Sequence, residues 1–152
     1  MKAIQITAFG GPDVMKYVDL ANPVAGTDEV VLDVTAVGIN YADTHQTENS
    51  YLSPQTLPMI PGIEVVGTHA GKRYLASVSS GGYAQKAIAH TSVLFPIPDV
   101  VTDEQALCML VQGATAWHLL KTMGNLQKGQ SVVVHAAAGG VGTIAIQLAK
   151  MW

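Results

Sequence analysis

The stretch from Ser131 to Trp152 reads SVVVHAAAGGVGTIAIQLAKMW. Its first part, Ser131 to His135, is almost uninterruptedly apolar and predicts a strand covered on both faces, as in parallel sheets. A glycine-rich turn follows, and the residues from Gly140 onward predict a helix that is apolar nearly all round. The order strand, glycine turn, helix is typical of the first unit of a parallel α/β sheet.

The turn carries a glycine pattern typical of dinucleotide-binding folds. Set against G-x-G-x-x-G, its three glycine positions hold Ala137, Gly139 and Gly142. We expect Gly139 to let the backbone approach a pyrophosphate, and the start of the helix to offer free N–H groups to the phosphates. We expect Gly142 to let the helix pack close to the strand. The alternative is that the turn serves only to pack the helix against the strand and binds no phosphate. The predicted cofactor-binding residues of the turn are Ala138, Gly139, Gly140 and Val141.

The chain before this stretch divides into a β-rich part and a helical part. Alternating or valine-rich segments predict strands at Lys2–Ala8, Met15–Leu20, Glu29–Val37, Ile63–His69, Arg73–Val78 and Tyr83–Ala89. The last two are expected to form a hairpin across residues 79–82. The polar segment Asn40–Asn49 favours one or two helical turns. This ordering indicates two domains.

Two helices are expected between residues 102 and 124. Thr102 and Gln105 have the spacing of a capping box, so a helix is predicted to begin there and to run to about Val111. Gly113 is expected to interrupt it. A second helix is predicted from Ala114 to Met123, with Gly124 ending it.

Composition excludes several classes of function. The chain is 49% hydrophobic and 12% charged, and its net charge of −3 provides no basic surface for nucleic acid. The single cysteine, Cys108, excludes an internal disulfide and a multi-cysteine zinc site, and its apolar surroundings predict core packing. No run of 18 apolar residues predicts a membrane span. The start of the chain does not read as a signal peptide, so the expected location is cytoplasmic.

A series of short motifs runs in order along the whole chain. They are Phe9-Gly10-Gly11-Pro12, Val37-Gly38-Ile39-Asn40-Tyr41-Ala42-Asp43, Pro61-Gly62-Ile63-Glu64-Val65-Val66-Gly67, Gly81-Gly82-Tyr83-Ala84, Gln112-Gly113-Ala114-Thr115-Ala116 and His135-Ala136-Ala137-Ala138-Gly139-Gly140-Val141-Gly142. With these motifs the chain resembles the medium-chain dehydrogenase/reductase superfamily, and within it the zinc-independent quinone oxidoreductases.

The resemblance implies a mixed α/β fold in two domains. A GroES-like β-barrel catalytic domain is expected over residues 1–113, and the first β-turn-α unit of a Rossmann domain over residues 114–152. Members of the family are longer than this chain. The expectation is therefore that the sequence is a truncated N-terminal portion, lacking most of the Rossmann sheet and the returning C-terminal segment.

The resemblance also implies that no metal is bound. Zinc-dependent members carry a cysteine ligand and a histidine ligand at the positions held here by Asn40 and Ile63. Neither side chain supplies the thiolate or the imidazole that catalytic zinc requires. Glu64, which remains from the zinc pattern, is interpreted as structural, and Asp43 as a brace of the local turn.

The implied activity is NAD(P)H-dependent reduction of quinones or related α,β-unsaturated carbonyls by direct hydride transfer. The expected cofactor is NADP or NAD, since the residue that discriminates them lies beyond the last residue given. The predicted catalytic residues are Asn40, Tyr51 and His45, and Asn40 and Thr115 are expected to contact the cofactor. A histidine at position 45, where quinone reductases often have tyrosine, can donate a proton near neutral pH.

Alternatives stay open at this point. Asn40 also suits a local turn, Tyr51 an exposed aromatic, and His45 a solvated helix position. The protein as a whole could instead be an enoyl or enone reductase of the same superfamily, or a non-catalytic fragment that acts only through association. The expected partner is a small quinone or enone. Because a buried helix and strand would lack neighbours, self-association or a missing remainder of the chain is also expected.

Overall fold

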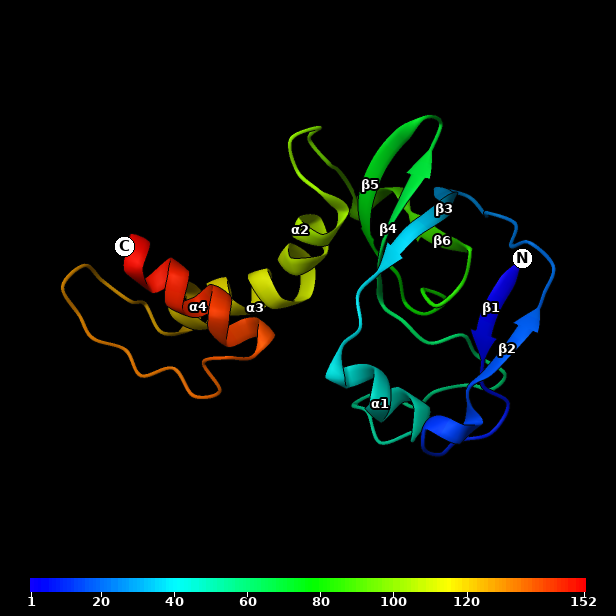
Figure 1. The fold of residues 1–152 in the computed structure, drawn as a ribbon, viewed down its shortest axis with the longest axis horizontal. Coiled ribbons are helices and arrows are strands. Elements are labelled where there is room, and N and C mark those ends of the chain that lie inside the picture. The colour runs from blue at the N-terminus through cyan, green and yellow to red at the C-terminus, as the bar shows by residue number, and fades with distance from the viewer. The chain divides into compact units, whose positions relative to one another are not determined.

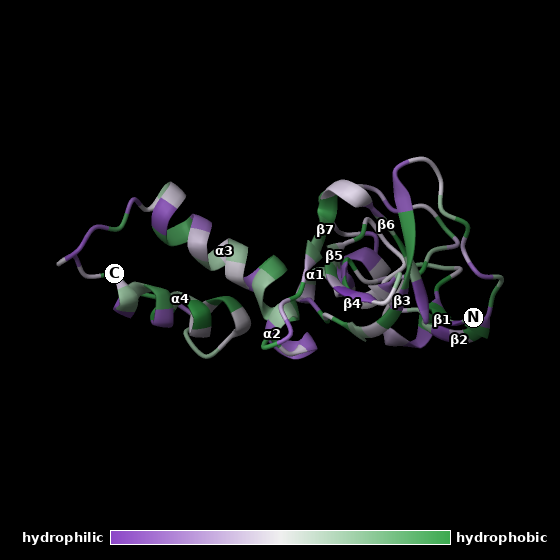
Figure 2. Ribbon diagram, turned by 90° about the horizontal axis from the view of Figure 1, so that it is seen from above, coloured by the Kyte–Doolittle hydropathy of each residue, from purple (hydrophilic) through white to green (hydrophobic).

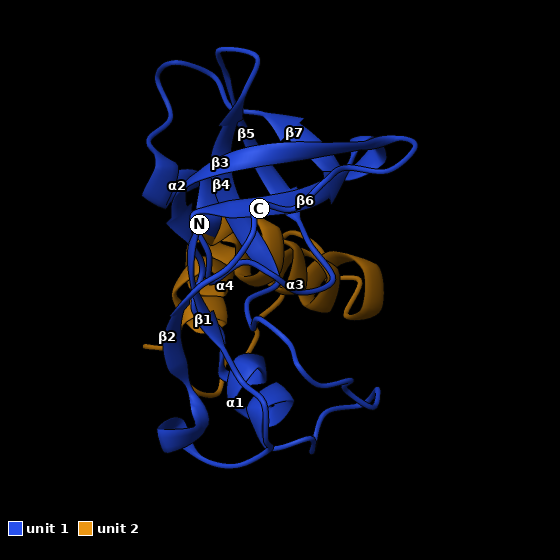
Figure 3. Cartoon of the chain, turned by 90° about the vertical axis from the view of Figure 1, so that its right-hand side faces the viewer, with its two compact units in different colours: residues 1–107 blue, residues 108–152 orange.

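The structure is a computed structural model that describes all residues from Met1 to Trp152. It divides into two compact units, unit 1 from Met1 to Leu107 and unit 2 from Cys108 to Trp152 (Figure 3). The predicted domain boundary, after residue 113, lies a few residues beyond the boundary between the two units. The assignment of residues 1–113 and 114–152 to two separate domains stays a prediction.

Unit 1 is built on antiparallel strands (Figure 1). A two-stranded ribbon pairs β1 (Lys2–Gln5) with β2 (Lys16–Asp19). A curled five-stranded sheet has the order β6-β3-β4-β5-β7. Its strands are β3 (Glu29–Val37), β4 (Glu64–His69), β5 (Lys72–Ser77), β6 (Lys86–His90) and β7 (Leu94–Pro96). The expected mixed α/β class, with a curled β-sheet first and helices after it, is confirmed.

Three short helical segments accompany the strands of unit 1. They are η1 (Pro12–Val14), α1 (Tyr41–Thr47) and η2 (Thr91–Val93). The predicted helical turns between Asn40 and Asn49 are therefore confirmed. α1 begins shortly after the end of β3, so the sheet sets where its first turn lies.

The predicted hairpin between Arg73–Val78 and Tyr83–Ala89 is wrong. β5 pairs with β4 on one edge and with β7 on the other, whereas β6 pairs with β3. Because a strand has only two edges for hydrogen bonding, β5 has none left for β6. The segment before β6 instead joins β1, where Ile4 N donates to Tyr83 O at 2.8 Å.

One face of the curled sheet forms the core of unit 1. The buried residues of this cluster come from β3, β4, β5, β6 and the residue directly after β5, namely Leu32, Val65, Ala76, Val78, Ala87 and Ala89. Small alanines on β5 and β6 face larger branched side chains on β3 and β4. This alternation lets the curled strands pack closely.

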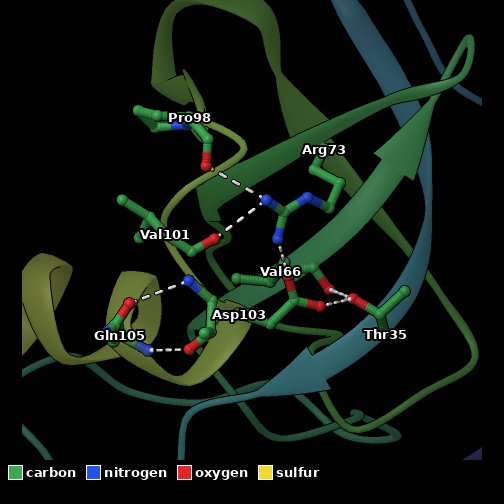
Figure 4. Close-up of polar contacts among 8 residues, drawn as sticks. Thr35, Val66, Arg73, Pro98, Val101, Asp103 and Gln105 are labelled. Carbon is green, nitrogen blue, oxygen red and sulfur yellow. Dashed lines mark hydrogen bonds and ion pairs between the residues drawn. The ribbon is translucent and has the colours of Figure 1, made fainter.

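The register of β3 against β4 shifts between Val34 and Ala36, which makes Thr35 the extra residue of a β-bulge. The Thr35 hydroxyl donates to Asp103 Oδ2 at 2.7 Å (Figure 4). Arg73 donates to Asp103 Oδ1 at 2.7 Å and to the carbonyl of Val101 at 2.9 Å. These bonds attach the start of α2 (Asp103–Cys108) to the sheet.

The predicted capping box at the start of α2 is confirmed. Thr102 N donates to Gln105 Oε1 at 3.0 Å, and Gln105 N donates to Thr102 Oγ1 at 3.2 Å. The two side chains thus satisfy N–H groups that have no partner inside the helix.

Unit 2 is helical. It contains η3 (Met109–Gly113, π-helical), α3 (Ala114–Trp117), η4 (His118–Met123, π-helical) and α4 (Gly140–Met151), and apolar residues recur along α4 (Figure 2). The expectation that Gly113 interrupts the helices is wrong, because its φ of −66° and ψ of −48° are helical. Gly124 does end the helical segment, as predicted, and its N donates to Leu119 O at 2.9 Å.

The strand predicted at Ser131–His135 is not formed. The residues from 131 to 134 lie outside any strand, and no backbone hydrogen bond joins them to another segment. A strand needs a second strand for its hydrogen bonds, and unit 2 contains none. The β-turn-α unit is therefore present as turn and helix, without its strand.

Helix contacts provide the core of unit 2. Its buried residues are Ala116, Leu120, Leu126 and Ala145, with Val134, Ile144 and Leu148 packed against them. The core packing predicted for Cys108 is wrong, because this residue is exposed at the end of α2 and is in neither cluster. None of the helices has both the length and the hydropathy needed to cross a membrane.

Candidate functional site

The first part of the candidate site is the start of α1. Asn40 precedes α1 and is only 7% exposed. Its N donates to Asp43 Oδ2 at 2.8 Å, which satisfies an N–H at the helix start. Its side-chain Nδ2 donates to Glu64 Oε1 at 2.9 Å. The carboxamide of Asn40 is thus held in one orientation by β4.

Glu64 is buried at the first residue of β4 and is 1% exposed. A Cβ added to Gly38 would lie 2.1 Å from Glu64 Oε1, so only glycine at position 38 leaves room for this carboxylate. Gly38 N in turn donates to Glu64 O at 3.1 Å. This packing agrees with the interpretation of Glu64 as a structural residue.

Asp43 connects α1 to the segment before β6. Its Oδ2 accepts the hydrogen bond from Asn40 N and another from the Tyr83 hydroxyl, at 2.7 Å. Burial, and then the hydrogen bond to the Asp43 carboxylate, raise the pKa of Tyr83 well above its usual value, so the phenol stays protonated as a donor. Asp43 therefore braces the turn, as expected.

A cavity of about 490 Å³ lies against α1 within unit 1. Its lining residues come from η1, α1 and the segment before β6, and they are Gly11, Pro12, Met15, Ile39, Asn40, Tyr41, Asp43, Thr44, Thr47, Glu48 and Tyr83. Of the three predicted catalytic residues, the structure brings only Asn40 to this cavity. Tyr41 and Tyr83 also line it, and the residue patterns had not singled them out.

His45 and Tyr51 lie next to this cavity in the sequence but do not line it. The half-buried His45 ring packs edge-on against the Tyr41 ring, with centroids 5.1 Å apart and planes at 87°. Its Nδ1 lies 3.0 Å from Ser50 Oγ. Tyr51 is 39% exposed in the segment that follows α1. The roles of Asn40, His45 and Tyr51 as catalytic residues stay predictions.

The second part of the candidate site is the glycine turn of unit 2. Gly139 precedes α4 in an extended conformation, and its N donates to Ala136 O at 2.9 Å. The first helical hydrogen bond runs from Thr143 N to Gly139 O at 2.9 Å. The N–H groups of the first three helical residues, Gly140 to Gly142, therefore have no acceptor in the helix.

Two glycines of this turn are required by their neighbours. A Cβ on Gly142 would lie 2.3 Å from Ala136 O, so this glycine lets α4 pack close to the turn before it, although the strand predicted there is not formed. A Cβ on Gly140 would lie 2.9 Å from Gln112 Cγ, so Gln112 packs against Gly140. Thr115 and Ala138 are exposed. The predicted contacts of the turn and of Thr115 with a cofactor stay predictions.

Metal-binding side chains do not gather anywhere in the chain, since no group of three histidines, cysteines or carboxylates has the geometry for an ion. At the two positions discussed above, Asn40 is bonded to Glu64, and Ile63 has no donor atom for a metal.

Comparison with protein families and known proteins agrees with this architecture. Residues 26–71 match the alcohol dehydrogenase GroES-like domain. The human quinone oxidoreductase is 33% identical over 165 residues, covering 100% of this chain and 50% of that protein. The human synaptic vesicle membrane protein VAT-1 homolog is 34% identical over 163 residues, covering 99% of this chain and 42% of that protein.

Solved structures are similar over the same extent. The quinone oxidoreductase of Thermus thermophilus, also solved in complex with NADPH, has a TM-score of 0.92 and 41% identity, covering 99% of this chain and 50% of that one. The Escherichia coli quinone oxidoreductase complexed with NADPH has a TM-score of 0.90 and 30% identity, with the same coverages. The chain spans about half the length of these relatives. Over its whole length the chain is a homologue of the quinone oxidoreductases, and residues 26–71 match a GroES-like domain.

Proposed function

We propose that the chain is part of an NAD(P)H-dependent, zinc-independent reductase of quinones or related α,β-unsaturated carbonyls. The observation that carries this proposal is the start of α4, where three N–H groups without a helical acceptor follow a glycine turn. Such a helix start binds the pyrophosphate of a dinucleotide. The NADPH complexes of two relatives support the same cofactor class, with NADP or NAD as the alternatives.

The residues present fit this cofactor. Gly139 and Gly140 have no side chain that could block a phosphate, and the residues that would hold it are Ala138, Gly139, Gly140 and Val141. The chemistry that a reduced nicotinamide supplies when bound is hydride donation. Around the cavity of unit 1, Asn40 would orient the carbonyl substrate, and His45 would donate a hydrogen bond or proton to its oxygen. Thr115 would add a hydrogen bond to the cofactor.

The experiment that tests the cofactor site is amide NMR of the chain with millimolar NADPH or NADH. We expect weak binding, with shifts confined to residues near Gly140 to Gly142, since the segment before the turn is not held in a sheet. Gly139→Asp should remove these shifts through a clash and through charge repulsion with the pyrophosphate. The matched control is Gly11→Ala, where an added Cβ meets nothing within 4 Å. Shifts that persist in Gly139→Asp would contradict the proposal.

Catalysis by the chain alone is a separate question. We expect no turnover of NADPH with a simple quinone by the 152-residue chain, because Val132 to Val134 leave the glycine turn without a supporting strand. Measured turnover would contradict this expectation, and micromolar affinity for NADPH, about −8 kcal/mol, would contradict the weak binding expected above. A quinone assay against an enone assay distinguishes the two reductase alternatives if activity is found.

The second candidate function is association without catalysis. It is favoured by the apolar surface of unit 2, where Val133 is 82% exposed, Met123 79% and Leu119 56%. Large exposed apolar patches on soluble proteins often mark sites of protein–protein contact. A second copy of the chain is the partner proposed for it. Reductase and association are distinguished by binding of NADPH or NADH at the start of α4, which only the first predicts.

A further inference from the structure

The end of α1 is a helix-termination motif with a defined geometry. Asn49 has a φ of 55°, in the left-handed region, and its N donates to Gln46 O at 3.2 Å. Ser50 N donates to His45 O at 2.9 Å. These two bonds and the left-handed residue between them are the features of a Schellman motif. The motif folds Ser50 back over the last turn of the helix.

In a Schellman motif the two residues at the ends of the longer hydrogen bond bring their side chains together, most often as an apolar contact. Here the pair is His45 and Ser50, and the contact is polar. Ser50 Oγ lies 3.0 Å from His45 Nδ1. Backbone and side chain of Ser50 thus both bind the same histidine.

The His45 ring has a second contact, with an aromatic side chain. The Tyr41 ring lies edge-on to it, one helical turn earlier on the same face of α1. Tyr41 itself lines the 490 Å³ cavity that contains Asn40. The imidazole therefore stands beside the cavity with its Nδ1 engaged, and only the distal nitrogen, Nε2, remains for a ligand.

Two other histidines have hydroxyl partners but lack this arrangement. His90 Nδ1 lies 2.7 Å from Ser92 Oγ, and His118 Nδ1 lies 2.8 Å from Thr122 Oγ1. Neither is packed against an aromatic ring that lines a cavity. What distinguishes His45 is the combination of a backbone motif, a hydroxyl partner and Tyr41.

We propose that Ser50 is a positioning residue for His45 and that it donates its hydroxyl hydrogen to Nδ1. The hydrogen on a neutral imidazole is then held at Nε2, because the bond made by one ring nitrogen determines the state of the other. Nε2–H donates a hydrogen bond to the carbonyl oxygen of a quinone or enone and so stabilises the negative charge that develops there. This inference rests on the proposed reductase function.

The first test is nitrogen-detected NMR of the histidine rings in the 152-residue chain, at a pH where they are neutral. We expect His45 to be almost wholly in the Nε2–H form. Ser50→Ala should raise the share of the Nδ1–H form several-fold, and Ser50→Thr should restore the wild-type ratio. His90 and His118 provide reference signals in the same spectrum, and Ser53→Ala is the control for an exposed serine. An unchanged ratio in Ser50→Ala overturns the proposal.

The second test measures binding of tetramethyl-1,4-benzoquinone, which is substituted at every ring carbon and so reacts slowly with Cys108. Loss of one ordered hydrogen bond, about 1.4 kcal/mol, corresponds to about a tenfold weaker affinity in Ser50→Ala. Equal affinities of wild type and Ser50→Ala overturn the proposal. If the wild-type chain binds no quinone, the proposed function fails, and the ring-nitrogen measurement still decides whether Ser50 positions His45.

Discussion

At the scale of single residues, each unit contains a glycine that a larger residue cannot replace. In each case an atom of another residue lies where the added Cβ would be. Gly38 accommodates the Glu64 carboxylate, and Gly142 accommodates Ala136 O. In both cases the glycine is required by the close approach of another group, not by an unusual backbone angle. The same close approach holds Asn40 in unit 1 and the glycine turn in unit 2.

Gly142→Ala should therefore destabilise unit 2. The added Cβ would lie 2.3 Å from Ala136 O and 2.7 Å from Ala137 Cα, so the start of α4 must move. Overpacking of this kind costs about 1–3 kcal/mol. Denaturant unfolding followed by tryptophan fluorescence measures this directly, because Trp117 and Trp152 are the two tryptophans and both lie in unit 2. Gly11→Ala should leave that transition unchanged, and an equally stable Gly142→Ala would show that the turn is not close-packed.

Asp103→Asn should remove a pH-dependent contribution to the stability of unit 1. The hydrogen bond from Thr35, and then the Arg73 guanidinium, hold the pKa of Asp103 below its usual value. Stability from a carboxyl with a lowered pKa is fully present above the unfolded value, about pH 4, and is lost as the pH falls through the folded value. Wild type should exceed the variant by about 1 kcal/mol at pH 7, after allowance for solvent screening.

The measurement for Asp103 is the free energy of unfolding of both proteins between pH 7 and pH 3. The difference should shrink toward the acid end of this range. Asp19→Asn is the control, because Asp19 pairs with Lys2 at the surface, where its side chain is 73% exposed. A difference between wild type and Asp103→Asn that is the same at pH 3 and pH 7 would contradict the role given to the carboxylate.

At the scale of elements, local signals predicted local structure. The valine-rich run predicted β3 with its observed bounds, Glu29–Val37, and the glycine turn predicted α4 from Gly140. The capping residues Thr102 and Gln105 marked the start of α2 because side chains and N–H groups within a single helical turn decide a helix start. Such signals lie within one segment, so the sequence alone suffices to read them.

Which strands pair with one another could not be predicted from such local signals. Two strands on either side of Ser79 to Gly82 predicted a hairpin of β5 with β6, but both edges of β5 are occupied by β4 and β7. In the candidate site, Asn40 was predicted from its position in a motif. Tyr41 and Tyr83 were missed because their roles arise from the cavity and from Asp43, both formed by segments distant in the sequence.

The unformed strand leads to a prediction about hydrogen exchange. Amides of Val132 to Val134 have no backbone acceptor and should exchange within a time close to that of an unfolded peptide. Amides from Ile144 to Leu148 lie within α4 and should be protected. Exchange measured by NMR or mass spectrometry at neutral pH checks this contrast. Strong protection at Val133 would show that the strand forms in solution with a partner.

At the scale of the whole molecule, each unit has its own core, but the two differ in how well that core is covered. Unit 1 closes its apolar cluster with five strands. In unit 2 a cavity of about 570 Å³ opens beside the core, lined in part by Leu119, Val132 and Val133. These side chains are apolar and exposed. The low charged fraction of 12% provides few charges to oppose contact there.

We therefore predict that the chain self-associates through unit 2. Each large apolar side chain left in water forgoes about 1.5–3 kcal/mol of burial, and the unpaired backbone of Val132 to Val134 can accept a strand from a second copy. Light scattering over a range of concentrations should show a mass that rises with concentration. Val133→Lys should shift this rise to higher concentration by placing a charge on the exposed segment. Val100→Lys, at a position in unit 1 that is 90% exposed, should not. A strict monomer at every concentration, with protected amides from Val132 to Leu148, would mean that unit 2 covers its apolar surface without a partner.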